Sequence, residues 1–68
     1  MSETAIVLYK FDAAENDQVS LRAGETITVT NKNIGGGWWK GVVENGQSGL
    51  FPEAFVKLKK LENAFQVI

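Results

Sequence analysis

The chain has 68 residues and contains neither histidine nor cysteine, so it holds at most one small domain whose core depends on packing alone. The formal net charge of −1 argues against nucleic acid as a partner, because nucleic-acid binding needs a clustered excess of Lys and Arg. Without His and Cys the usual general base, thiol nucleophile and zinc ligands are missing. We therefore expect no enzyme, no cofactor and no metal site.

The first residues, MSETAIV, lack the basic start of a secretory signal, and no apolar run approaches the roughly 20 residues of a membrane span. We expect a cytoplasmic protein without direct membrane insertion. Asp12, Glu15 and Asp17 lie close together, but they lack the turn glycine and closing Glu of a calcium-binding EF-hand loop. They are interpreted as a solvated acidic loop.

Strand signals and turn signals alternate in the first half of the chain, and no convincing helix interrupts them. Residues 5–11, AIVLYKF, are rich in β-branched and aromatic side chains and predict a strand. Residues 12–24 predict an acidic loop that returns as a short strand. In residues 25–30, ETITVT, Ile27 and Val29 share one face, which is typical of a half-buried strand.

The second half predicts a loop, a hairpin and a short edge strand. The loop is NKNIGGG at 31–37, the hairpin strands at 38–44 and 47–51 meet at Asn45-Gly46, and a turn plus edge strand follows at 53–58. Pro52 interrupts the ladder because it has no N–H to donate. Five short strands in about 55 residues indicate an all-β fold, a small five-stranded antiparallel barrel or sandwich.

The two tryptophans stand side by side in one predicted strand, so they must point to opposite faces of the sheet. Gly41 and Val43 share the side of Trp39, which marks that side as the better covered one. Trp38, with Lys40, is therefore the candidate for exposure. The alternative is that Trp38 covers one end of the barrel, as a typical Trp would.

Four motifs in order resemble the Src homology 3 (SH3) domain family. They are VLYKF at 7–11, VSLRAGETI at 19–27, WWKG at 38–41 and GLFPEAFV at 49–56. The resemblance covers residues 5–58 and implies a five-stranded barrel, in which 12–24 form the RT loop, 31–37 the n-Src loop and Asn45-Gly46 the distal hairpin. It also implies a monomeric interaction module that binds proline-rich peptides, as part of a larger adaptor, cytoskeletal or signalling protein.

The resemblance implies a groove of five residues: Tyr9, Phe11, Trp38, Pro52 and Phe55. A polyproline II peptide has little conformational entropy left to lose, so flat aromatic ridges can hold its prolines at low ordering cost. The indole N–H of Trp38 would donate to a free peptide carbonyl. Taken without the resemblance, Tyr9 and Phe11 could face either the core or solvent, and the pattern favours a core position for Phe55 and a strand terminator for Pro52.

Partner choice is expected to depend on Glu15, Asn16, Asp17 and Gln18. Many family members carry an acid at the position of Gln18, and this acid pairs with a basic residue of the peptide. A neutral Gln supplies no charge, so a basic anchor would depend on Asp17 or Glu15.

Two further departures from the family pattern concern polar contacts. Ala54 replaces a common Asn, and Phe55 replaces a common Tyr. Each lost hydrogen bond is worth roughly 0.5 to 1.5 kcal/mol, so we expect weaker or atypical peptide binding.

The resemblance also implies a set of core positions: Val7, Val19, Leu21, Ile27, Val29, Gly41, Phe51 and Val56. Two roles are open for Gly35–Gly37. They could keep bulky side chains away from Trp38, or they could be a linker without consequence.

Residues 59–68 form a tail in which Leu61, Phe65 and Ile68 recur at helical spacing. This tail could be disordered, docked on the barrel, or left over from where the chain was cut. An alternative function is a structural or assembly barrel whose aromatic surface packs against the tail or a second copy. A methyl-lysine cage or a nucleic-acid barrel would need a closed aromatic cluster or a basic face, and neither is clear in the sequence.

Overall fold

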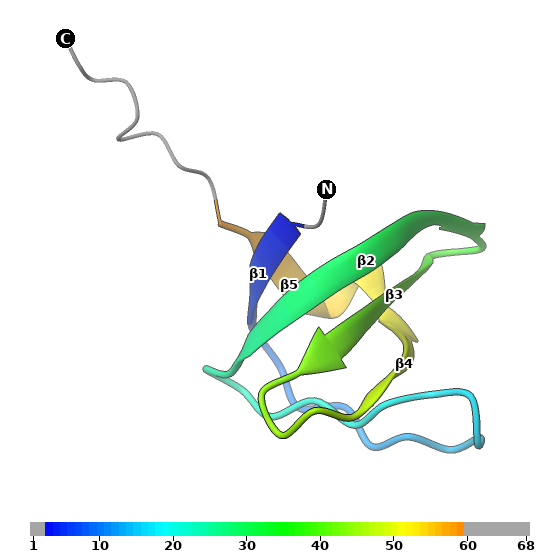
Figure 1. The fold of residues 1–68 in the computed structure, drawn as a ribbon, viewed down its shortest axis with the longest axis horizontal. Coiled ribbons are helices and arrows are strands. Elements are labelled where there is room, and N and C mark those ends of the chain that lie inside the picture. Colours follow the sequence, from blue (N-terminus) through cyan, green and yellow to red (C-terminus); the bar gives the residue numbers. More distant parts are fainter. Residues whose placement is uncertain (1–2, 60–68) are drawn as a thin grey trace, which may run out of the picture.

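The computed structural model describes residues 3–59 as one strongly bent antiparallel sheet (Figure 1). The strands are β1 (Glu3–Val7), β2 (Thr26–Gly35), β3 (Trp38–Val43), β4 (Ser48–Pro52) and β5 (Val56–Leu58). Their order in the sheet is β4-β3-β2-β1-β5. The predicted five-stranded all-β fold is confirmed, and the helical part of residues 3–59 is one 3-10 turn, η1 (Glu53–Phe55).

No helix within residues 3–59 is long and apolar enough to cross a membrane. The alternatives for the tail from residue 60 onward fall outside the described residues.

The core lies inside the bend of the sheet and is entirely apolar over the described residues. Alternation along the strands produces it, since β1 and β2 bury every second residue of their paired segments. The buried hydrophobic residues are Ala5, Val7, Val19, Leu21, Ile27, Val29, Val43, Phe51 and Val56. All eight predicted core positions are buried, Gly41 included.

The first predicted strand is too long, because β1 ends at Val7. The backbone N–H of Leu8 donates to the carbonyl of Phe55 at 2.7 Å, so the chain turns toward η1 and leaves the β1–β2 ladder. It rejoins the barrel only at Phe11, which forms an isolated bridge with Leu21. The short return strand predicted within 12–24 is likewise reduced to isolated bridges.

The predicted loop at 31–37 is wrong, because β2 continues through Gly35 and pairs there with Trp38. In this part of the hairpin the β2 residues are exposed to solvent. Polar residues are therefore compatible with a strand here, which is why the composition resembles that of a loop. The turn itself is Gly36–Gly37, with φ of 67° and 88°. Two successive positive φ values match a two-residue hairpin turn that favours glycine. Gly36 and Gly37 are therefore a tight turn rather than a linker, and Gly35 ends β2 with a φ of 89°.

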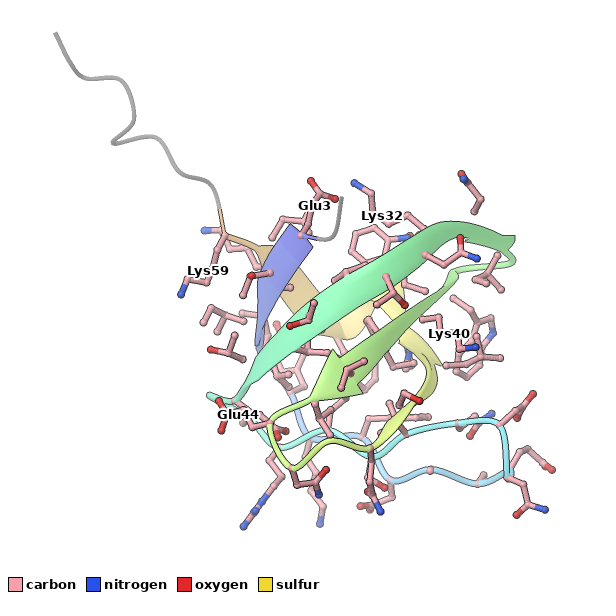
Figure 2. All side chains as sticks on the ribbon, viewed as in Figure 1. Glu3, Lys32, Lys40, Glu44 and Lys59 are labelled. Atoms are coloured by element: carbon pink, nitrogen blue, oxygen red, sulfur yellow. The ribbon has the colours of Figure 1, made fainter. Side chains whose placement is uncertain are left out.

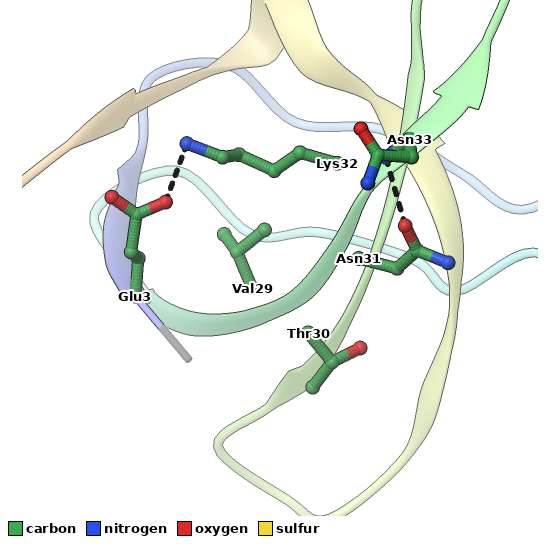
Figure 3. Close-up of a pocket in the computed structure, with 6 residues that line it drawn as sticks. All are labelled: Glu3, Val29, Thr30, Asn31, Lys32 and Asn33. Atoms are coloured by element: carbon green, nitrogen blue, oxygen red, sulfur yellow. Dashed lines mark hydrogen bonds and ion pairs between the residues drawn. The ribbon is translucent and has the colours of Figure 1, made fainter. Parts of the chain in front are cut away.

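Trp39 is half-buried against the core, and a lysine from β2 covers it. The ammonium of Lys32 lies 5.5 Å from the centroid of the Trp39 ring and pairs with the Glu3 carboxylate on β1. Figure 3 shows this ion pair at the edge of a polar recess. The recess is lined by Glu3, Val29, Thr30, Asn31, Lys32 and Asn33.

The segment 12–20 is held against β4 by two backbone hydrogen bonds. The N–H of Leu50 donates to the Asp17 carbonyl at 2.8 Å, and the N–H of Val19 donates to the Leu50 carbonyl at 2.9 Å. This close approach requires a glycine beside Leu50. A Cβ on Gly49 would lie 2.8 Å from the carbonyl carbon of Gln18 and 2.9 Å from the Asp17 oxygen, closer than side-chain carbons approach backbone.

We predict that Gly49→Ala lowers the free energy of unfolding by about 1–3 kcal/mol, because the added methyl group must push the segment 12–20 away from β4. Urea denaturation measures the change. Ser48→Ala, at an exposed neighbouring position of the same strand, is the control and should stay within about 0.5 kcal/mol of the wild type. Equal stability of the two variants would show that the approach is not tight.

Candidate functional site

Four aromatic rings form a continuous row on the barrel surface. Tyr9 meets Phe55 with ring centroids 5.9 Å apart, Phe55 meets Phe11 at 6.0 Å, and Phe11 meets Trp38 at 6.0 Å. The interplanar angles are 85°, 86° and 69°, so each contact is edge to face. Edge-to-face pairs are favourable because the positive rim of one ring faces the negative face of the other. The row therefore fixes the rings relative to one another.

Three separate segments supply these rings, which explains why no single stretch of sequence shows the site. Tyr9 and Phe11 belong to the segment that leaves β1, Phe55 ends η1, and Trp38 begins β3. Pro52, the fifth predicted residue, stands directly opposite Trp38 in the β3–β4 ladder. The predicted groove residues are thus brought together, four through ring contacts and Pro52 through strand pairing.

The row is partly open to solvent. Tyr9 is 60% exposed, whereas Phe11, Trp38 and Phe55 are half-buried. The Trp38 ring is not sealed inside the monomer, and its indole N–H takes part in none of the side-chain hydrogen bonds found within residues 3–59. A donor at the end of an apolar row is thus available to a partner.

The two tryptophans are buried to a similar extent, contrary to the expectation that Trp38 would be the exposed one. Both are half-buried, and what separates them is their neighbours. Trp39 packs on the core under Lys32, while Trp38 touches the ring of Phe11. Gly36 lies beside this indole, since a Cβ there would be 3.8 Å from the Trp38 Cδ1 atom.

Three of the four predicted specificity residues face solvent, and the fourth makes hydrogen bonds within its own segment. Glu15, Asn16 and Asp17 are exposed, and Gln18 is half-buried. The Gln18 Oε1 atom accepts the backbone N–H groups of Ala14 at 2.8 Å and Glu15 at 3.3 Å. Because these two amides occupy the acceptor, the Gln18 oxygen is not free to accept a hydrogen bond from a basic residue of a peptide. Among these four residues, Glu15 and Asp17 carry the negative charge.

Sequence reasoning missed the role of Gln18 within its own loop and two exposed apolar residues. Leu8 is 42% exposed and Ile34 is 39% exposed. The exposure of Ile34 was not predicted, because the composition of residues 31–37 indicates a polar loop. A β-branched residue in this stretch was nevertheless compatible with a strand. No local signal distinguishes a Gln that holds a turn from one that faces solvent.

Comparison with known proteins agrees with this architecture. Residues 7–57 match the family model described as a variant SH3 domain. The human SH3 domain-containing kinase-binding protein 1 is 40% identical over 53 residues, which cover 76% of this chain and 8% of that protein. The human CD2-associated protein is 41% identical over 61 residues, or 90% and 9% of the two chains. The chain spans less than a tenth of the length of these curated relatives.

Two of the similar solved structures are complexes with peptides. The C-terminal SH3 domain of myosin IB from Entamoeba histolytica, bound to a peptide, is 35% identical with a TM-score of 0.79, covering 88% of this chain and 97% of that one. The yeast Nbp2p SH3 domain, in complex with a peptide from Ste20p, is 27% identical with a TM-score of 0.83, covering 91% and 92%. The motifs, the barrel and the match over residues 7–57 together show that this chain belongs to the SH3 domain family.

Proposed function

We propose that residues 5–58 are a non-catalytic recognition domain that binds proline-rich peptides along the row Tyr9, Phe55, Phe11 and Trp38, with Pro52 beside it. The observation that carries the proposal is the row itself, because it is continuous and partly open to solvent. The two similar SH3 domains solved with peptides support it. The domain acts as a monomer within a larger cytoplasmic adaptor, cytoskeletal or signalling protein.

The geometry of the rings suits a polyproline II helix. Such a peptide has three residues per turn and presents its prolines as ridges. The rings that meet edge to face offer neighbouring apolar surfaces, and the proline ridges of the peptide pack on them. The Trp38 indole donates to a peptide carbonyl, which is free because proline has no N–H to pair with it.

The segment 12–20 sets partner choice in this proposal. Glu15 and Asp17 attract a basic residue that flanks the prolines, and Asn16 adds a polar contact at the tip. Gln18 does not meet the peptide through its acceptor. It keeps the tip of the segment in one conformation by accepting the amides of residues 14 and 15.

We predict that Trp38→Ala lowers affinity for the best peptide of a proline-rich array by about tenfold or more, since central aromatic residues dominate such interfaces. Isothermal titration calorimetry measures the dissociation constant, and circular dichroism verifies that the barrel is retained. Trp39→Phe is the matched control, because it alters a ring on the opposite face of β3 and should leave affinity within about twofold. Retained affinity in Trp38→Ala would contradict the groove, and concentration-dependent sedimentation of the wild type would favour an assembly role.

The acids of the segment 12–20 are tested with paired peptides that carry either Arg or Gln beside the prolines. Glu15→Gln and Asp17→Asn should each weaken binding of the Arg peptide by about two- to fivefold, as exposed ion pairs do, and should leave the Gln peptide unchanged. Raising the salt concentration should remove the difference between the peptides. A loss of affinity that is equal for both peptides would assign these acids a structural role instead.

The role given to Gln18 predicts different outcomes for two substitutions. Gln18→Ala removes the acceptor of two backbone amides, so hydrogen exchange at residues 14 and 15 should accelerate and stability should fall by about 0.5–1.5 kcal/mol. Gln18→Glu keeps an acceptor and should preserve slow exchange. If both variants exchange like the wild type, the side chain does not hold the segment.

A further inference from the structure

The outer face of β3 and β4 continues beyond the aromatic row. Alternation places Trp38, Lys40 and Val42 on the same face of β3, and the ladder sets Pro52, Leu50 and Ser48 opposite them in that order. Val42 and Leu50 are half-buried, although the face on which they lie is turned away from the core. An apolar strip therefore runs from Trp38 along the two strands, and Lys40 is the charged residue within it.

Lys40 is an exposed cation whose backbone is fixed. Its carbonyl accepts the Thr30 hydroxyl at 3.2 Å, and its strand position is paired with Leu50. The ion pairs found within residues 3–59 join Lys10 to Asp12 and Lys32 to Glu3, so Lys40 has no acid within 4.0 Å in this part of the chain. Figure 2 shows Lys40, in that view, between the β2–β3 hairpin and the segment 12–20.

The strip is bordered by opposite charges. On one side Leu50 is hydrogen-bonded to Asp17 and Val19, which brings the acidic segment 12–20 alongside β4. On β3, the ammonium of Lys40 projects from the same face as the Trp38 ring. A peptide that continues from the aromatic row past Trp38 would therefore lie near the Lys40 ammonium and over the apolar side chains of Val42 and Leu50. Charge complementarity on the rim of an interface selects partners even where it adds little affinity.

We propose that Lys40 is a specificity-determining residue, which selects peptides that carry an acidic residue in the segment running past Trp38 over β3 and β4. An apolar side chain next to this acid packs on Val42 and Leu50. The proposal rests on the proposed function, since it concerns the continuation of the same peptide beyond its proline core. A basic residue at the same place is disfavoured by repulsion from Lys40.

The test uses the best proline-rich peptide of the array, extended at each end by four Gly or Ser residues. Glu, Gln or Lys replaces each added residue in turn, and affinity is measured for the wild type, Lys40→Glu and Lys40→Gln. Lys57→Glu is the matched control, because it makes the same change in net charge at an exposed position of β5. Amide shifts of Val42 and Leu50 in ¹⁵N-labelled protein report where the extension lies.

We expect the wild type to prefer Glu over Gln by about two- to fivefold at one end of the peptide only. Lys40→Gln should abolish this preference and Lys40→Glu should invert it in favour of Lys, while Lys57→Glu should keep it. The Glu extension should shift the Val42 and Leu50 amides beyond the change caused by the unextended peptide.

Three results would overturn the inference. One is the absence of a Glu preference in the wild type at every added position, although the unextended peptide binds. Another is a preference that survives in Lys40→Glu. The third is that the unextended peptide itself does not bind, in which case the proposed function fails and the inference fails with it. Binding of the unextended peptide without any Glu preference would overturn the inference alone.

Discussion

The pairing of Leu50 with Asp17 and Val19 is the interaction on which the surface of this domain depends. It joins the segment 12–20, which has almost no regular structure of its own, to a strand of the barrel. Because no side chain fits between the two backbones, Gly49 is as necessary to this surface as the hydrogen bonds are. These contacts hold the segment alongside β4, the strand in which Pro52 stands opposite Trp38.

The sequence predicted those elements whose periodicity reflects the core. Ile27 and Val29 alternate in β2 as expected, and the eight predicted core positions are buried, because burial on one face imposes a period of two. Prediction failed where tertiary contacts decide. β1 ends at Val7 because Leu8 bonds to Phe55, a residue far along the chain, and the ribbon through Gly35 is polar because both its faces are solvated.

The family motifs singled out residues that the structure places together, whereas no sequence signal indicated how they contact one another. The family motifs identified Tyr9, Phe11, Trp38, Pro52 and Phe55, and the structure brings them together through ring contacts and strand pairing. The use of Gln18 as an acceptor for neighbouring amides has no sequence signature, because it depends on how the tip of its segment folds back. The adjacency of the two tryptophans likewise predicted that they lie on opposite faces of the strand. The contact of Lys32 with Trp39 could not be predicted, because it depends on the register between β2 and β3.

The two-residue turn at Gly36–Gly37 brings the end of β2 directly to Trp38. Only two residues separate Gly35 from Trp38, so the turn lies next to the Trp38 ring at the end of the aromatic row. A ligand that reaches Trp38 from this side therefore meets the backbone of the turn rather than side chains, because neither turn residue has one.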